Sequence, residues 1–199
     1  MSTVLVTGAT GLIGTRLCKK LEERGYDVAI LSRSRKRKLE TPVYLWDWKK
    51  NEIDEEAVSK ADYIIHLAGA NMANKRWSNR RKQLLHDSRV KSAQLLFKEV
   101  KKRSNDLKAY ISASAIGYYG TVTTDKIFTE TDPPADDFLG KTCHEGEKSA
   151  DSFKELGIRI VVIRTGIALT RKGGALSKMM APIKLGLGAA IGTGRQYIP

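Results

Sequence analysis

Cysteine is scarce in this sequence, whose 199 residues include only Cys18 and Cys143. The two lie far apart without C-x-x-C spacing, and no cluster of further ligands accompanies them, although His144 follows Cys143. This pattern argues against a disulfide scaffold and against a cysteine-based zinc site. We therefore expect two reduced thiols and no metal.

Long apolar runs are absent as well. No stretch approaches the roughly 20 apolar residues that a membrane-spanning helix needs. Met1 leads directly into the strand-like Val4–Val6, without the basic and apolar regions of a signal peptide. We expect a cytoplasmic protein with no membrane partner.

Acidic residues are the minority charge, with 22 Asp and Glu against 35 Lys and Arg and a net charge of +13. Such a balance can indicate nucleic-acid binding. The basic residues, however, form scattered groups at 33–38, 75–82 and 98–103, without interleaved aromatic residues for base stacking. We interpret them as a solvated basic surface and expect no nucleic-acid partner. Strongly salt-dependent retention on DNA or RNA would indicate the alternative.

Short apolar runs alternate with helical patterns along most of the chain. The helical patterns span Leu12–Leu21, with Gly25 as a C-cap, then Leu84–Val100, and Leu139–Leu156, which closes at Gly157. The runs typical of buried parallel strands are Val4–Thr7, Val28–Leu31, Val43–Trp46, Tyr63–Leu67, Ala109–Ser112 and Ile158–Ile163.

This alternation predicts an α/β fold of the Rossmann type. We expect a doubly wound parallel sheet in the order 3-2-1-4-5-6, with helices on both faces. From Gly166 onward the sequence becomes rich in glycine and the alternation stops. We therefore expect an NAD(P)-binding domain at 1–165 and the start of a small C-terminal substrate lobe at 166–199.

A glycine-rich turn lies at the first strand-to-helix junction. Gly8, Gly11 and Gly14 have the spacing that provides a tight turn, close backbone approach to a pyrophosphate and close packing of helix on sheet. The helix N-terminus adds amides that bind anions. The alternative is a tight turn without a ligand. The cofactor-binding residues that we predict here are Gly8, Thr10, Gly11, Leu12 and Ile13.

The end of the second strand distinguishes the two nicotinamide cofactors. A site for NAD needs an acid there to accept a hydrogen bond from the ribose 2′-hydroxyl, whereas a 2′-phosphate needs a hydroxyl and a guanidinium. The chain has Ser32 and Arg33 at this point and no acid between Asp27 and Glu40. We predict that NADP(H) is preferred over NAD(H), with Arg33 as the main phosphate partner. The basic residues after Arg33 also fit a solvated loop.

Further motifs occur in a characteristic order. They are Gly8–Gly14, Leu67–Gly69, Lys75–Trp77, Asp87–Arg89, Ser112–Gly120, Arg164–Gly166, Leu185–Gly188 and Gly192–Gln196. Together they resemble the atypical short-chain dehydrogenase/reductase branch described as the NAD-dependent epimerase/dehydratase-like family. The resemblance covers the whole chain. Members of that family are longer, so we expect this chain to lack most of the C-terminal lobe.

The resemblance implies further cofactor-binding residues. It implies that Leu67, Ala68 and Gly69 lie beside the adenosine and the pyrophosphate, and that Arg89 occupies a helix position facing the site. It also implies that the segment from Gly166 to Ala168 lines the nicotinamide end.

Catalytic residues are less clearly marked. Short-chain dehydrogenases use a Ser or Thr after the fifth strand and a Tyr-x-x-x-Lys pair, in which Lys lowers the pKa of the Tyr. Ser114 fits the first role, but alignment on Glu147 puts Leu139 and Cys143 at the Tyr and Lys positions. Tyr118 or Tyr119 is the candidate replacement for the phenol, and aromatic packing beneath a loop is the alternative for both.

Two functions remain open at this point. The first is an NADP(H)-dependent epimerase, dehydratase or oxidoreductase acting on a small carbonyl or sugar-like substrate. The second is a catalytically impaired NADPH sensor or partner-binding module. The sequence does not choose the substrate or the oligomeric state.

Overall fold

The computed structural model describes residues 1–35, 41–73, 75–103, 106–121, 124–170, 173–189 and 194. Within these ranges, the strands are β1 (Thr3–Thr7), β2 (Asp27–Ser32), β3 (Val43–Asp47), β4 (Glu52–Ile53), β5 (Tyr63–His66), β6 (Ala109–Ala115) and β7 (Arg159–Thr165). The helices are α1 (Leu12–Glu22), α2 (Glu55–Ser59), α3 (Asn79–Lys101), α4 (Phe138–Asp151) and α5 (Gly174–Lys184), with 3₁₀ helices η1 (Ile116–Tyr119) and η2 (Ser152–Leu156).

The described strands form one sheet in the order β4-β3-β2-β1-β5-β6-β7. All neighbours pair in parallel except β3 and β4, which are antiparallel with Trp46 opposite Ile53. Without the short edge strand β4, the order is the expected 3-2-1-4-5-6, so the predicted Rossmann-type fold is confirmed. The carboxyl ends of the parallel strands therefore lie along one edge of the sheet, where such folds bind ligands.

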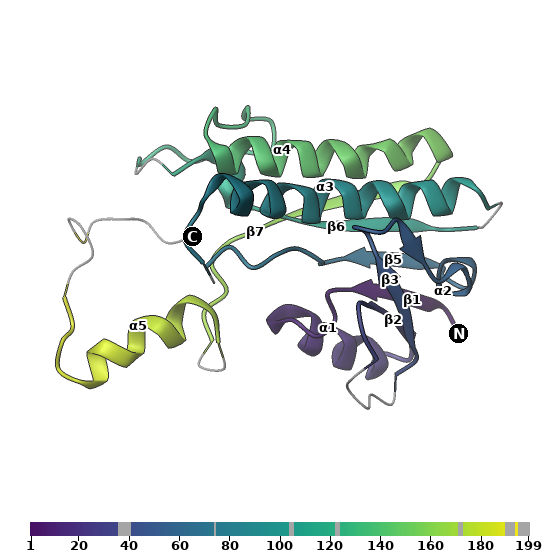
Figure 1. Ribbon diagram of the computed structural model, residues 1–199, viewed down its shortest axis with the longest axis horizontal. Coiled ribbons are helices and arrows are strands. Elements are labelled where there is room, and N and C mark those ends of the chain that lie inside the picture. The colour runs from purple at the N-terminus through teal and green to yellow at the C-terminus, as the bar shows by residue number, and fades with distance from the viewer. Residues whose placement is uncertain are drawn as a thin grey trace.

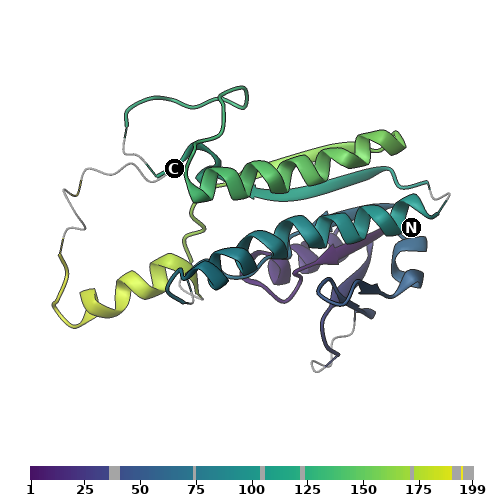
Figure 2. The ribbon, with the colours of Figure 1, turned by 45° about the horizontal axis from the view of Figure 1, so that its top comes forward.

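Helices cover both faces of the sheet (Figures 1 and 2). On one face, Leu5 and Ile64 pack in a cluster with Val58 of α2, Leu96 of α3 and Phe153 of η2. On the other face, the neighbouring side chains of β1 pack against Cys18 of α1. Because successive side chains of a strand point to opposite faces, a strand buried on both sides has a continuous apolar run.

The element boundaries differ from the sequence prediction in several places. The long helical pattern before Gly157 divides into α4 and η2, and Gly157 ends it in the left-handed region at φ +71°. Helix α3 begins earlier than expected because the Ser78 hydroxyl caps it by accepting from the Arg81 amide. The expectation that strand–helix alternation stops at Gly166 was wrong in one respect, since α5 follows β7. Figure 1 shows α5 to one side of the sheet.

Among the described residues, no helix is both long enough and apolar enough to cross a bilayer.

Candidate functional site

A pocket of about 770 Å³ lies at the carboxyl ends of β1, β2, β3 and β5. Its size is in the range of small-molecule and cofactor sites. The pocket brings together much of the predicted cofactor site and also residues that were not predicted. It is lined by Gly8, Ala9, Thr10, Gly11, Ile30, Leu31, Ser32, Arg33, Ser34, Val43, Trp46, Trp48, Lys49, Leu67, Ala68, Gly69, Ala70, Asn71, Lys75, Arg81, Leu84 and Ser88.

Each of the three glycines of the turn is suited to its position for a different structural reason. Gly8 has φ +70°, and a Cβ there would lie 2.8 Å from the backbone of Leu67. A Cβ on Gly14 would lie 2.3 Å from the Gly8 carbonyl oxygen, so Gly14 permits α1 to pack on β1. Gly11 has an ordinary φ of −78°, and apart from its chain neighbours a Cβ would meet only the Gly8 carbonyl oxygen, at 3.2 Å, within the described ranges. Gly11 is therefore the glycine that leaves space on the pocket side.

The N-terminus of α1 presents backbone donors at this turn. Its N-cap, Gly11, has no side-chain acceptor for the first-turn amides. The first turn of a helix leaves N–H groups unpaired, and the helix dipole favours an anion beside them. The turn thus combines open space with free donors, which fits a pyrophosphate.

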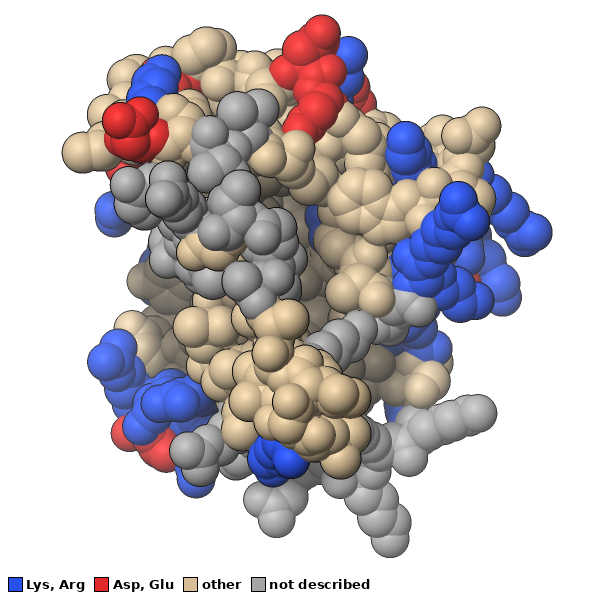
Figure 3. Space-filling view, turned by 90° about the vertical axis from the view of Figure 1, so that its left-hand side faces the viewer, with Lys and Arg blue, Asp and Glu red and all other residues tan. Residues whose placement is uncertain are grey.

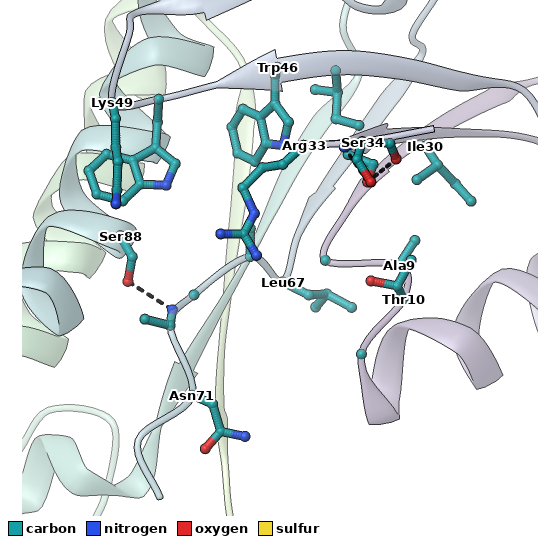
Figure 4. A pocket seen from close by; sticks show the side chains of 18 of the residues that line it. Ala9, Thr10, Ile30, Arg33, Ser34, Trp46, Lys49, Leu67, Asn71 and Ser88 are labelled. Carbon is teal, nitrogen blue, oxygen red and sulfur yellow. Dashed lines mark hydrogen bonds between the residues drawn. The ribbon is translucent and has the colours of Figure 1, made fainter. Parts of the chain in front are cut away.

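Arg33 extends from the end of β2 into the pocket, towards the Leu67 loop and near Trp46 (Figure 4). The Ser32 hydroxyl donates to the Ser34 carbonyl oxygen at 3.0 Å and accepts from the Ser34 amide at 3.4 Å, so it holds the local turn. The basic residues at 36–38, which follow in sequence, lie outside the described residues. The structure thus places both predicted residues in the lining, with the guanidinium as the group that reaches inward.

The described lining carries four basic side chains, Arg33, Lys49, Lys75 and Arg81, and no acidic one. Asp47 ends β3 close by in sequence, but it is not among the lining residues, and its Oδ1 accepts from the Lys49 amide at 2.9 Å. The electrostatic character of the pocket is therefore positive, and it favours an anionic ligand.

The loop from Leu67 to Asn71 forms one wall and is held by hydrogen bonds from two elements. The Ala68 amide donates to Thr7 Oγ1 at 3.1 Å, and the Ala70 amide donates to Ser88 Oγ at 2.9 Å. Arg89 lies behind the wall, where its Nη1 donates to the Leu85 carbonyl oxygen at 2.8 Å and approaches that of Ala70 at 3.5 Å. A Cβ on Gly69 would lie 3.2 Å from this guanidinium. Arg89 therefore supports the wall and does not line the pocket.

His66 connects the same wall to α3. The Ser88 carbonyl oxygen can only accept, so it takes the Ser92 hydrogen at 2.7 Å, and His66 Nε2 donates to Ser92 Oγ at 3.0 Å. In the neutral imidazole, Nδ1 then accepts from Thr7 Oγ1 at 2.8 Å. Burial, with the positive charge of Arg89, lowers the pKa of His66 to about 4. The wall of the pocket thus depends on a neutral, buried imidazole.

A second polar cluster lies at the carboxyl ends of β6 and β7. The Ser114 hydroxyl donates to Glu147 Oε1 at 2.5 Å, and Arg164 binds both oxygens of Glu147, with Nε at 3.0 Å and Nη2 at 2.8 Å. The hydrogen bond to Glu147 raises the pKa of Arg164, so the guanidinium stays charged. The one hydrogen of Ser114 is thus committed to a carboxylate of the protein.

The two tyrosines of η1 belong to this second cluster. Arg164 lies over the Tyr118 ring, 3.5 Å from its centroid, and its Nη1 donates to the Tyr119 hydroxyl at 2.8 Å. Tyr119 itself donates to the Thr129 carbonyl oxygen at 2.9 Å. In this arrangement Tyr118 and Tyr119 pack around Arg164. Their catalytic role, and that of Ser114, stays a prediction.

The alignment of α4 on Glu147 has a structural counterpart. A Cβ on Gly117 would lie 3.5 Å from the Leu139 Cβ and 3.9 Å from the Cys143 Sγ, so both side chains face the loop after β6. Burial raises the pKa of the Cys143 thiol, against the smaller opposing effects of Arg89 and Ser114. An apolar side chain and a protonated thiol thus face the loop at the positions that the alignment assigned to Tyr and Lys.

The structure keeps some predicted residues apart from the pocket. Leu12 and Ile13 are 40% and 47% exposed beside it, and Gly166 and Ala168 follow β7 without joining the described lining. Leu12 instead lies against Gly174, whose Cβ would be 3.4 Å from a Leu12 methyl carbon. The cofactor roles of these four residues stay predictions.

Comparison with known proteins identifies the family. A model described as the NAD dependent epimerase/dehydratase family matches residues 4–165. The chain belongs to this family. The predicted resemblance is thereby confirmed.

Relatives of this epimerase/dehydratase-family chain match along nearly all of it. An epimerase family protein of Mycobacterium bovis is 34% identical, and the match covers 99% of this chain and 64% of that protein. An epimerase family protein of Staphylococcus aureus is also 34% identical, and the match covers 99% of this chain and 65% of that protein. The solved structure of human epimerase family protein SDR39U1 (isoform 2) with NADPH has a TM-score of 0.80 at 32% identity, with 99% of this chain and 64% of that chain covered. A nucleoside-diphosphate sugar epimerase from Corynebacterium glutamicum has a TM-score of 0.82 at 29% identity, with 99% and 40% covered.

This family member spans about 64% of the length of the curated relatives that it matches. The match of 4–165 includes every strand of the described sheet and the second polar cluster. The family match therefore includes the part of the chain that forms the pocket, and the reaction of a whole relative is a separate question.

Several lining residues of this family member were missed by sequence reasoning. Trp48 and Lys49 directly follow β3, so the rule that ligands bind after the carboxyl ends of strands could have found them. Arg81, Leu84 and Ser88 have the spacing of one helix face, which the basic pattern of the segment obscured. Trp46 carries no such signal, because in sequence it is simply another apolar strand residue.

Proposed function

We propose that this chain binds NADP(H), in preference to NAD(H), in the pocket at the carboxyl ends of β1, β2, β3 and β5. The observation that carries the proposal is a described lining with four cations and no acid. A 2′-phosphate has a charge near −2, and a guanidinium fork matches its oxygens. A site that selects NAD would instead present a carboxylate to the ribose.

The glycine turn supports the same assignment. Gly11 leaves space beside unpaired amides of α1, which suits the diphosphate of either cofactor. Arg33 and Lys49, which both line the pocket, would then favour NADP(H) over NAD(H) by pairing with its extra 2′-phosphate. The human relative solved with NADPH, at 32% identity, supports the choice of NADP(H).

Titration of the chain with NADPH and with NADH tests this proposal. Trp46 and Trp48 line the pocket, so energy transfer from indole to bound reduced nicotinamide reports binding directly. We expect saturable quenching by NADPH at lower concentrations than by NADH. Quenching without saturation by both cofactors would contradict the proposal.

For the reaction, we propose an epimerase, dehydratase or oxidoreductase acting on a small carbonyl or sugar-like substrate. The cofactor supplies the hydride chemistry when it is bound, and the protein orients the substrate. The part of the chain at 1–165 would hold the cofactor, and 166–199 would begin the substrate lobe. A nucleotide-sugar substrate is one candidate, given the nucleoside-diphosphate sugar epimerase among the relatives.

A second candidate is an NADPH-binding sensor or partner-binding module with impaired chemistry. Leu139 and Cys143 face the loop after β6, and the Tyr119 hydroxyl is engaged by Arg164 and Thr129. No phenol with a neighbouring Lys is thus provided at the aligned positions. NADPH oxidation with a panel of carbonyl compounds and nucleotide sugars separates the two candidates. Turnover supports the enzyme, and tight binding without turnover supports the sensor.

A further inference from the structure

Arg81 differs from the other cations of the pocket in its hydrogen bonding. One of its terminal nitrogens, Nη2, donates to the Asn71 carbonyl oxygen, which fixes the side chain against the loop after β5. Its Nε is buried and has no hydrogen-bond acceptor among the described residues. A buried donor without an acceptor is destabilising by roughly 1–3 kcal/mol, so it is uncommon unless a ligand or water pairs with it.

The surroundings of Arg81 are cationic. Lys75 lines the same pocket, and Arg89 lies behind Gly69 in the same wall. The pKa of Arg89 is lowered, chiefly by burial and in part by the neighbouring charge of Arg81. Within the described ranges, no carboxylate forms an ion pair with Arg81, Lys75 or Arg89. Figure 3, viewed from the side where α3 begins, shows Asp and Glu mainly along its upper edge.

This cationic region is separate from the Arg33 end of the pocket. Figure 4 shows Asn71 at one end of the view, beyond the Arg33 guanidinium, and Arg81 is tied to Asn71. The glycine turn comes from a third direction, at the start of α1. The pocket thus has cations beyond those that the 2′-phosphate and the turn require.

We propose that Arg81 and Lys75 form a second anion site of the pocket, which binds a phosphoryl group. The Arg81 Nε–H has no acceptor among the described residues, and Lys75 adds a point charge to the same lining, as in other phosphate sites. A phosphoryl group brings a charge near −2, which fits two cations without a carboxylate. The group comes either from a phosphorylated substrate or from the diphosphate of the cofactor. The assignment to a substrate rests on the proposed binding of NADP(H).

Calorimetric titration with inorganic pyrophosphate tests the site in the full chain, both free and saturated with NADPH. The variants are Arg81→Gln, Lys75→Gln and the control Arg80→Gln. Arg80 is exposed, is not part of the described lining and loses the same charge. Thermal unfolding checks that each variant folds. If Arg81→Gln fails to fold, Arg81→Lys serves in its place, because it keeps the charge and removes the fork.

A substrate site predicts that pyrophosphate binds the NADPH-saturated protein, and that Arg81→Gln weakens this binding by about 10- to 100-fold. Arg81→Gln then weakens NADPH binding by a clearly smaller factor than pyrophosphate binding, because Arg33 and the glycine turn also hold the cofactor. If pyrophosphate only competes with NADPH, and Arg81→Gln weakens both equally, the phosphoryl group is that of the cofactor. If Arg81→Gln behaves as Arg80→Gln in every titration, the site does not exist. Pyrophosphate titration of the free protein shows whether Arg81 binds an anion even if NADPH does not bind. Failure of this proposal can therefore be told apart from failure of the proposed function.

Discussion

Two regions at the carboxyl edge of the sheet differ in how their charges are satisfied. At the pocket after β1, β2, β3 and β5, the described lining has four cations and no acid, and the first-turn amides of α1 have no side-chain cap. Around β6 and β7, Arg164 is paired with Glu147, and Ser114 donates to the same carboxylate. The cations of the first region have no acidic partner in the described lining, whereas the charges of the second are paired within the protein.

On the proposed function, this difference separates the region that would bind the cofactor from the region where Ser114 is predicted to act. Polar groups of the pocket gain partners when an anionic ligand binds, so binding is favourable without rearrangement. A substrate at Ser114 would have to compete with Glu147 for the only hydroxyl hydrogen.

Gly11→Val should abolish NADPH binding, by at least about a hundredfold. The side chain would fill the space beside the α1 amides, while its Cβ contacts only the Gly8 carbonyl oxygen apart from its chain neighbours in the described part of the chain. Calorimetry measures the affinity and circular dichroism the fold. Gly14→Val is the contrasting variant, and it should unfold the protein because its Cβ would lie 2.3 Å from the Gly8 carbonyl oxygen. Wild-type affinity in Gly11→Val would reduce the motif to a turn.

The fold was largely predictable because several separate stretches of the sequence each indicate a strand or a helix. The central strands β1 and β2 are apolar runs, such as Val4–Thr7, buried on both faces, and the parallel order follows from the handedness of crossovers. The two-residue β4 and the five-residue α2 are too short to give a periodic signal. Helix α5 was missed because glycine precedes it and Pro182 lies inside it.

Low pH should weaken the wall of the pocket through His66. The folded protein keeps this imidazole neutral, with a pKa of about 4, whereas the unfolded chain binds a proton below about 6.5. The stabilisation is therefore complete above pH 6.5 and declines by about 3 kcal/mol as the pH falls to 4. Urea unfolding across this range should show a shallower decline in His66→Gln than in the wild type. Identical slopes would mean that His66 does not titrate as described.

Glu147→Gln should destabilise the second region by about 2 kcal/mol, because it leaves the Arg164 charge without its carboxylate. The NADPH affinity should not change. Glu145→Gln is the matched control on the same helix, since Glu145 is 51% exposed, and it should change the stability by less than about 1 kcal/mol. Chemical unfolding and cofactor titration give the two readouts. A tenfold loss of NADPH affinity in folded Glu147→Gln would show that the regions are coupled.

The site was less predictable than the fold. Ser32 and Arg33 follow directly from their place after β2, and both line the pocket. Arg89 was expected at a helix position facing the site, but it lies behind the wall and supports it, a distinction that depends on side-chain direction. The pairing of Ser114 with Glu147 and Arg164 joins three elements, so only the folded chain brings it together.

The most direct test of the account is the ratio of NADH to NADPH dissociation constants in the wild type and in Arg33→Ala. Arg33 reaches into the pocket from the end of β2, and a charge-assisted hydrogen bond to a phosphate contributes roughly 1.5–3 kcal/mol. Calorimetry should give tighter binding of NADPH in the wild type and a ratio lowered about tenfold in Arg33→Ala, with NADH affinity nearly unchanged. Equal dissociation constants for the two cofactors in the wild type would contradict the account.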